Sequence, residues 1–170
     1  MGVGALGGDV LDKLDYMGFE VFGFGFSEKS NFPFPYYSKN QLAEFLAQIN
    51  VLVCLLPLTP ETEGILNLEL FRQCTKGTYL INVARGKHLV EEDLIPALDQ
   101  GFLSGALLDV YRIEPLPQDH LFWEESRIQL TPHIASVTNP LAASPQIIDN
   151  FNRLKSNQPL QNLVNRERGY

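Results

Sequence analysis

Residues 1–10 read MGVGALGGDV, and Gly2, Gly4 and Gly7 within them form a G-x-G-x-x-G pattern. In dinucleotide-binding folds this pattern is the turn between a first β-strand and a first α-helix. Apolar residues do recur at helical spacing over residues 5–17, but a single Met stands where the strand is expected. An isolated match of this kind also arises by chance. The rest of the chain therefore decides whether the glycines mark a cofactor site.

Beyond this turn, strand-like and helix-like segments alternate. We expect strands at residues 20–26, 51–55, 79–83, 105–110 and 127–130, and helices at 5–17, 41–48, 67–74, 91–100 and 145–156. The proline-rich residues 31–38, NFPFPYYS, are expected to form a loop. The alternation predicts an α/β fold, a doubly wound parallel sheet with helices on both faces. We place this domain at residues 1–140, followed by a C-terminal helix and tail at residues 141–170.

Composition narrows the partners and the compartment. The formal net charge of −7 argues against nucleic acid or an anionic membrane as a partner. The two cysteines, Cys54 and Cys74, are too few for a disulfide framework, and Cys54 lies in an apolar run typical of a buried thiol. We find no signal-peptide pattern, no membrane-spanning run and no metal-binding motif. The expectation is a cytoplasmic protein.

Reactive side chains follow three of the expected strands. Arg85, Glu114 and His133 come after the strands at 79–83, 105–110 and 127–130, and the carboxyl ends of parallel strands share one edge of the sheet. A histidine held by a carboxylate is a good proton donor, and an arginine matches a substrate carboxylate. Taken singly, each could also be an ordinary loop residue, which is how we interpret His88 and His120.

Four stretches resemble a known family, in that family's order: LLPLTPET (55–62), GTYLINVARG (77–86), GALLDVYRIEPLP (105–117) and LTPHIAS (130–136). The family is the D-isomer-specific 2-hydroxyacid dehydrogenases, whose cofactor domain is of the Rossmann type and binds NAD(P). The resemblance implies that Arg85, Glu114 and His133 are catalytic. Together with the glycine turn and the loop after the second strand, the expected cofactor contacts are Gly2, Gly4, Ala5, Leu6, Gly7, Ser27, Lys29, Pro57, Thr62, Val83, Ala84, Arg85, Asp109, His133 and Ser136.

The resemblance also implies an activity, a cofactor and a partner. It implies reduction of a small 2-oxo acid, glyoxylate to glycolate or hydroxypyruvate to D-glycerate, and a homodimer formed through the cofactor domain. Ser27 and Lys29 could hold the extra phosphate of NADPH, although Glu28 between them would repel it, so we favour NADPH over NADH. The alternatives are a phosphoglycerate or D-lactate type of dehydrogenase, a binding module without catalysis, and an inactive remnant.

Members of the family carry an N-terminal substrate domain ahead of the first strand of the cofactor domain. This sequence matches the part that follows that strand. We therefore expect the chain to lack the first strand and the substrate domain, to which the C-terminal helix would return. The isolated chain is expected to turn over weakly or not at all, because the missing part would complete the substrate pocket.

Overall fold

The computed structural model describes residues 1–166 and divides the chain into two compact units. The first unit is Met1–His133, and the second begins at Ile134. The sequence analysis placed the division after residue 140, close to the start of the last helix. Residues 167–170, the end of the expected tail, lie outside the described residues. No helix within residues 1–166 is long and apolar enough to cross a membrane.

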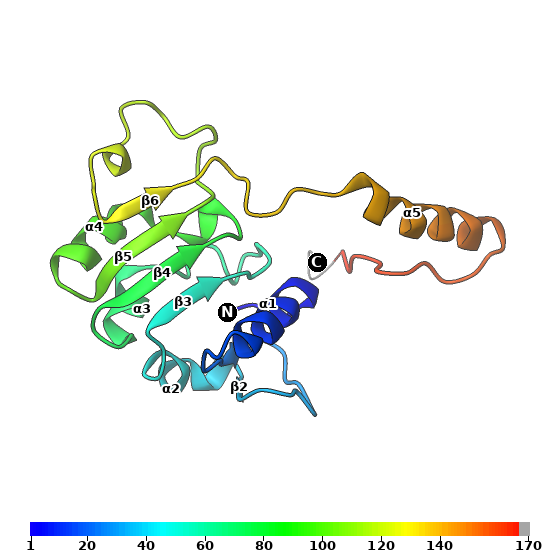
Figure 1. Cartoon of the computed structure of the whole chain (residues 1–170), viewed down its shortest axis with the longest axis horizontal. Coiled ribbons are helices and arrows are strands. Elements are labelled where there is room, and N and C mark those ends of the chain that lie inside the picture. The colour runs from blue at the N-terminus through cyan, green and yellow to red at the C-terminus, as the bar shows by residue number, and fades with distance from the viewer. Residues whose placement is uncertain (167–170) are drawn as a thin grey trace. The chain divides into compact units, whose positions relative to one another are not determined.

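The first unit is built on a parallel sheet with the strand order β3-β4-β5-β6. Its strands are β3 (Val51–Cys54), β4 (Thr78–Asn82), β5 (Leu103–Leu108) and β6 (Ile128–Leu130), which Figure 1 shows as a row of arrows pointing the same way. Leu52, Leu80 and Leu108, one from each of three neighbouring strands, are fully buried. All four strands fall within two residues of the expected starting positions, and the parallel sheet is confirmed.

Helices lie on both faces of this sheet, as a doubly wound fold requires. In Figure 1, α1 (Ala5–Tyr16) is nearer the viewer than the sheet, while α3 (Leu68–Gln73) and α4 (Glu91–Asp99) lie behind it. The Asn67 side chain caps α3 by accepting a hydrogen bond from the Leu70 amide at 3.0 Å. The Asp93 carboxylate of α4 accepts a hydrogen bond from the Leu68 amide at 2.9 Å, which ties the two helices together.

A second, two-stranded sheet pairs β1 (Gly23–Phe24) with β2 (Tyr36–Tyr37) in parallel. The strand expected at 20–26 is therefore much shorter, and part of the stretch expected to be a loop is a strand. The Gly23 amide bonds to the Pro35 carbonyl at 2.9 Å. Proline has no main-chain N–H to donate, but its carbonyl can still accept a hydrogen bond, and this contact uses the Pro35 carbonyl. A short connection follows, through α2 (Leu42–Leu46), into β3.

Met1 and Gly2 join the two sheets. The Gly2 amide bonds to the Phe24 carbonyl at 2.8 Å, and the Leu55 amide bonds to the Met1 carbonyl at 2.9 Å. These residues lie between β1 and β3, where the strand order 3-2-1-4-5-6 places the first strand of a Rossmann-type fold. The glycine turn therefore stands at the centre of the unit and leads directly into α1.

The described part of the second unit contains α5 (Pro140–Lys155). The expected start at residue 145 is wrong. Asn139 caps the helix by accepting a hydrogen bond from the Leu141 amide at 3.0 Å, and Pro140 occupies the first helical position, where proline is well tolerated. Pro145 lies inside the helix.

Candidate active site

The three reactive residues predicted from the sequence all follow strands of the main sheet. Arg85 comes after β4, Glu114 after β5 and His133 after β6. Since these strands are parallel neighbours, their carboxyl ends meet at one edge of the sheet. The structure therefore brings the three loops together within the first unit.

His133 and Glu114 form the central contact of this edge. The His133 Nδ1 atom lies 2.8 Å from the Glu114 Oε2 atom, and the Glu114 Oε1 atom accepts a hydrogen bond from the Tyr111 amide at 3.0 Å. Burial by itself raises the pKa of Glu114, but the hydrogen bonds from His133 and Tyr111, with the nearby charge of Arg85, hold that pKa below its ordinary value. Glu114 is therefore an ionised acceptor at neutral pH. It fixes the proton on Nδ1 and leaves Nε2 as the ring nitrogen for a substrate.

The backbone at His133 is bent toward this contact. The His133 amide bonds to the Thr131 carbonyl at 3.1 Å, which closes a three-residue turn around Pro132. His133 has a φ of 55°, in the left-handed region that residues other than glycine rarely adopt. Residues held in such sparsely populated conformations cluster at functional sites.

Arg85 is an exposed residue on a firmly held backbone. The Asn82 side-chain amide donates to the Arg85 carbonyl at 3.2 Å, and the Ala84 amide donates to the Asn82 Oδ1 atom at 3.2 Å. Gly86 packs directly on the next loop, because a Cβ atom there would stand 1.9 Å from the Tyr111 carbonyl carbon. The loops of Arg85 and Glu114 are thus in contact backbone to backbone.

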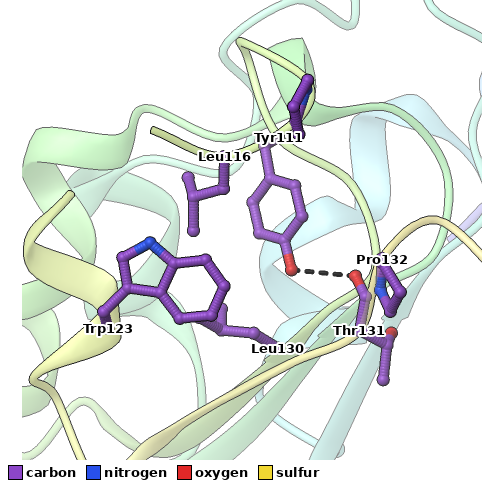
Figure 2. Close-up of a pocket in the computed structure, with 7 residues that line it drawn as sticks. Tyr111, Leu116, Trp123, Leu130, Thr131 and Pro132 are labelled. Carbon is purple, nitrogen blue, oxygen red and sulfur yellow. Dashed lines mark hydrogen bonds between the residues drawn. The ribbon is translucent and has the colours of Figure 1, made fainter. Parts of the chain in front are cut away.

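A cavity of about 300 Å³ lies beside the two loops that carry Glu114 and His133. Figure 2 shows the Tyr111 ring in this cavity with its hydroxyl bonded to the Thr131 carbonyl, at 2.9 Å. The same hydroxyl lies 3.0 Å from the Leu108 carbonyl. Tyr111 therefore ties the end of β5 to the end of β6. The remaining lining is mostly apolar and consists of Pro115, Leu116, Trp123, Leu130, Thr131 and Pro132.

The glycine turn fits a dinucleotide phosphate. A Cβ atom at Gly7 would stand 1.9 Å from the Gly2 carbonyl oxygen, so the turn and α1 are packed as tightly as the motif requires. At Gly4, by contrast, a Cβ atom would meet nothing within 4 Å. Ala5 and Leu6 are exposed, and the first turn of α1 carries no acidic residue. The amide groups at this helix start are thus open to an anion.

The other expected cofactor residues differ in exposure. Thr62 is 3% exposed, and its hydroxyl donates to the Pro57 carbonyl at 2.7 Å, so it holds the shape of that loop. Asp109 is 1% exposed and accepts a hydrogen bond from the Thr131 hydroxyl at 2.5 Å. Ala84 is buried and Val83 half-buried, directly before Arg85.

The residues expected around an additional phosphate are exposed. Ser27 and Lys29 lie on the loop after β1, and the Lys29 ammonium stands 5.3 Å from the centroid of the Phe32 ring. Glu28 between them is exposed as well. Ser136 is an exposed residue of the second unit.

Sequence reasoning missed His88. It was expected to be an ordinary loop residue, but it is fully buried, and both of its ring nitrogens face main-chain groups of the loops that hold Pro57 and Arg85. Its burial depends on a parallel bridge between Leu66 and Leu89, distant in sequence. The one local signal is the apolar pair that follows it, Leu89-Val90. His120 is partly exposed and stands 3.7 Å from the Glu91 carboxylate.

A doubly wound parallel sheet with an arginine and a carboxylate–histidine pair at its carboxyl edge defines a nucleotide-binding domain of the dehydrogenase class. Residues 1–135 match the family model described as "D-isomer specific 2-hydroxyacid dehydrogenase, NAD binding domain". The chain belongs to this family of oxidoreductases, as the four motifs predicted.

Curated relatives carry a more specific name. The chain is 46% identical over 171 residues to "Glyoxylate/hydroxypyruvate reductase A" of Serratia proteamaculans, and 44% identical over 174 residues to the protein of that name from Escherichia fergusonii. Each match takes in 100% of this chain and 55% of the relative. The chain thus spans about half the length of the curated relatives it matches.

Solved structures agree with the fold. A D-isomer specific 2-hydroxyacid dehydrogenase from Xanthobacter autotrophicus Py2, crystallised with NADPH and MES, superposes with a TM-score of 0.95 at 38% identity over 99% of this chain and 70% of that one. An NADPH-dependent glyoxylate/hydroxypyruvate reductase from Sinorhizobium meliloti, crystallised with NADP and sulfate, gives 0.94 at 37% identity over 100% of this chain and 55% of that one.

Proposed function

We propose that this chain supplies the acid–base pair and the carboxylate-binding arginine for reduction of a small 2-oxo acid by a nicotinamide cofactor. The observation that carries the proposal is the 2.8 Å contact between His133 Nδ1 and Glu114 Oε2, formed at the sheet edge where Arg85 also lies. A carboxylate that fixes one ring nitrogen of a histidine leaves the other to exchange a proton with substrate.

Each residue has a distinct role in this reaction. The Arg85 guanidinium binds the substrate carboxylate through paired hydrogen bonds and orients the 2-oxo group. His133 donates a proton from Nε2 to the carbonyl oxygen as negative charge develops there. Glu114 stabilises the imidazolium before the transfer and keeps the ring oriented afterwards. The reduced nicotinamide, when bound, supplies the hydride.

The cofactor would be held by the glycine turn, the start of α1 and the loops after β3 and β4. Open amides at Ala5 and Leu6 suit the pyrophosphate. Exposed Ser27 and Lys29 suit the additional phosphate of NADPH, and both structural relatives described above were crystallised with NADP or NADPH. NADPH is therefore the cofactor that we propose, with NADH as the alternative.

Glyoxylate and hydroxypyruvate are the substrates that we propose, because the curated relatives are named for them. The relatives are nearly twice as long as this chain, so the part that they have in addition can contribute to the substrate pocket. We expect the isolated chain to bind NADPH but to turn over weakly.

A chimaera tests the proposal. The segment of the Serratia relative that this chain matches is replaced by residues 1–170, and NADPH oxidation is followed with glyoxylate, hydroxypyruvate, pyruvate and phosphohydroxypyruvate. We expect activity with the first two acids and a loss of at least about 100-fold in the His133→Ala chimaera, the usual contribution of a general acid. Equal rates for the chimaera and its His133→Ala variant would refute the catalytic assignment. A preference for pyruvate or phosphohydroxypyruvate would instead favour a D-lactate or phosphoglycerate type of enzyme.

A further inference from the structure

His88 joins two loops that follow neighbouring strands. One loop contains Pro57, after β3, and the other contains Arg85, after β4. The His88 side chain lies between their main chains and is 0% exposed. A fully buried histidine needs partners for both ring nitrogens, and the two loops provide them.

Main-chain groups of both loops meet the ring nitrogens of His88. The Pro57 carbonyl, 3.3 Å from Nε2, can only accept a hydrogen bond, so this contact requires a hydrogen on Nε2. Nδ1 lies 3.3 Å from the Arg85 amide nitrogen, which can donate to it, and 3.0 Å from the Arg85 carbonyl oxygen, so it meets both main-chain groups of Arg85. In the neutral tautomer with its hydrogen on Nε2, the ring donates to the Pro57 carbonyl and accepts from the Arg85 amide.

The surrounding backbone holds this ring in place. The Leu66 amide bonds to the His88 carbonyl at 2.9 Å, and the Val90 amide bonds to the Leu66 carbonyl at 3.0 Å. The Pro57 carbonyl also accepts from Thr62, and the Arg85 carbonyl accepts from the Asn82 side chain. Both carbonyl groups near the His88 ring are thus also held by a second side chain, Thr62 at Pro57 and Asn82 at Arg85.

We propose that His88 is a positioning residue that holds the Arg85 main chain at a fixed distance from the Pro57 loop. The proposal rests on the proposed function for its consequence: it couples the residue that binds the substrate carboxylate to the loop that contacts the nicotinamide cofactor. His88 itself touches neither ligand. Its effect passes through the Arg85 amide on one side and the Pro57 carbonyl on the other.

Two substitutions separate the two contacts. In His88→Asn, the side-chain oxygen can take the place of Nδ1 and accept from the Arg85 amide, while the donor to Pro57 is lost. In His88→Gln, the longer side chain can donate to the Pro57 carbonyl, while the acceptor for Arg85 is lost. His88→Phe removes both and keeps a ring of similar volume. His120→Asn, at a loop histidine of the same unit that contacts neither Pro57 nor Arg85, is the matched control.

The first measurement is hydrogen exchange at the Arg85 amide in the full chain, which needs no ligand. We expect protection in the wild type, His88→Asn and His120→Asn, and faster exchange by about three- to tenfold in His88→Gln and His88→Phe, the range for loss of one hydrogen bond. Equal exchange in all five proteins would overturn the proposal. Near-ultraviolet circular dichroism identifies any variant that has lost its native packing, and the Asn–Gln comparison remains if the Phe variant has.

The second measurement is ligand binding by the same proteins, with NADPH fluorescence and with oxalate as a carboxylate probe added to the NADPH complex. We expect His88→Asn to weaken NADPH binding and His88→Gln to weaken oxalate binding, each by about three- to tenfold. Equal losses of both ligands in both variants would show a general structural role and would overturn the proposal that each ring nitrogen positions one loop. A wild type that protects Arg85 but binds neither ligand would refute the proposed function and leave His88 as the residue that holds the Arg85 loop.

Discussion

Replacing Gly86 with alanine is expected to separate the loops that carry Arg85 and Glu114. A Cβ atom at residue 86 would stand 1.9 Å from both the carbonyl carbon and the carbonyl oxygen of Tyr111, and 2.5 Å from the Arg112 amide nitrogen. These neighbours are backbone atoms, so no side-chain rotation relieves the overlap, and one loop must move by more than 1 Å to restore ordinary contact.

The cost follows from that overlap. Forced overpacking usually destabilises a protein by about 1–3 kcal/mol, and a clash with backbone belongs at the upper end, about 3 kcal/mol. For a chain of this length, each kcal/mol changes the melting temperature by about 2–4 °C, so we expect Gly86→Ala to melt about 6–12 °C lower than the wild type. A displaced Arg85 loop should also weaken oxalate binding to the NADPH complex by about tenfold or more, since losing a hydrogen bond to a charged group costs about 1.5–3 kcal/mol.

Gly8→Ala is the matched control for this experiment. Gly8 lies inside α1, and a Cβ atom there would meet nothing within 4 Å. Alanine is favoured over glycine in a helix by up to about 1 kcal/mol, so this variant should melt at or slightly above the wild-type temperature. Thermal melts of the three proteins by circular dichroism provide the comparison. A Gly86→Ala melting temperature within about 2 °C of the wild type would refute the inferred close approach of the two loops.

Three further predictions concern other parts of the chain. Hydrogen bonds from Arg127 lower the pKa of Glu125 to about 2, from 4.5, so the wild type should be more stable than Glu125→Gln above about pH 4.5, and the difference in melting temperature should disappear as the pH falls toward 2. Asn139→Ala should lose about 1 kcal/mol of capping energy and speed hydrogen exchange in the first turn of α5, whereas Asn139→Asp should retain protection. Glu28→Lys should tighten NADPH relative to NADH by about fivefold in fluorescence titrations, and an unchanged ratio would place the additional phosphate elsewhere.

Local patterns predicted most of the helices and strands, and the exceptions have identifiable causes. The alternating phenylalanines at 22, 24 and 26 indicated a long strand, but only Gly23–Phe24 has a neighbouring strand to pair with. The strand at Tyr36–Tyr37 could not be predicted, because the prolines at residues 33 and 35 are typical of a loop. The helix α5 begins five residues earlier than expected. Both Pro145 and Pro140 are compatible with a helix start, and the capping residue Asn139 selects Pro140.

The common location of these reactive side chains could be predicted because parallel strands place their carboxyl ends together, a property of the fold that the alternation of elements already indicates. Arg85, Glu114 and His133 needed no knowledge of packing to be assigned to one edge. His88 could not be found in this way, since its burial depends on the pairing of Leu66 with Leu89. Contacts between segments distant in sequence leave no local pattern in either segment.

The supporting contacts show what such a site requires beyond its reactive side chains. Contacts to main-chain carbonyl groups set the spacing of the three loops. Gly86 lies against the Tyr111 carbonyl, and the Tyr111 hydroxyl lies within hydrogen-bonding distance of the carbonyl groups of Leu108, at the end of β5, and Thr131, directly after β6. A contact made by main-chain atoms is more rigid than a contact between long side chains, because there are no side-chain rotamers to be fixed or to move out of the way. Buried neighbours can therefore fix the positions of an exposed arginine and an exposed histidine relative to each other. A substitution at Gly86 or Tyr111 should consequently disturb the geometry of the site more than an Arg85→Lys change, which alters only the side-chain group that we propose binds the substrate.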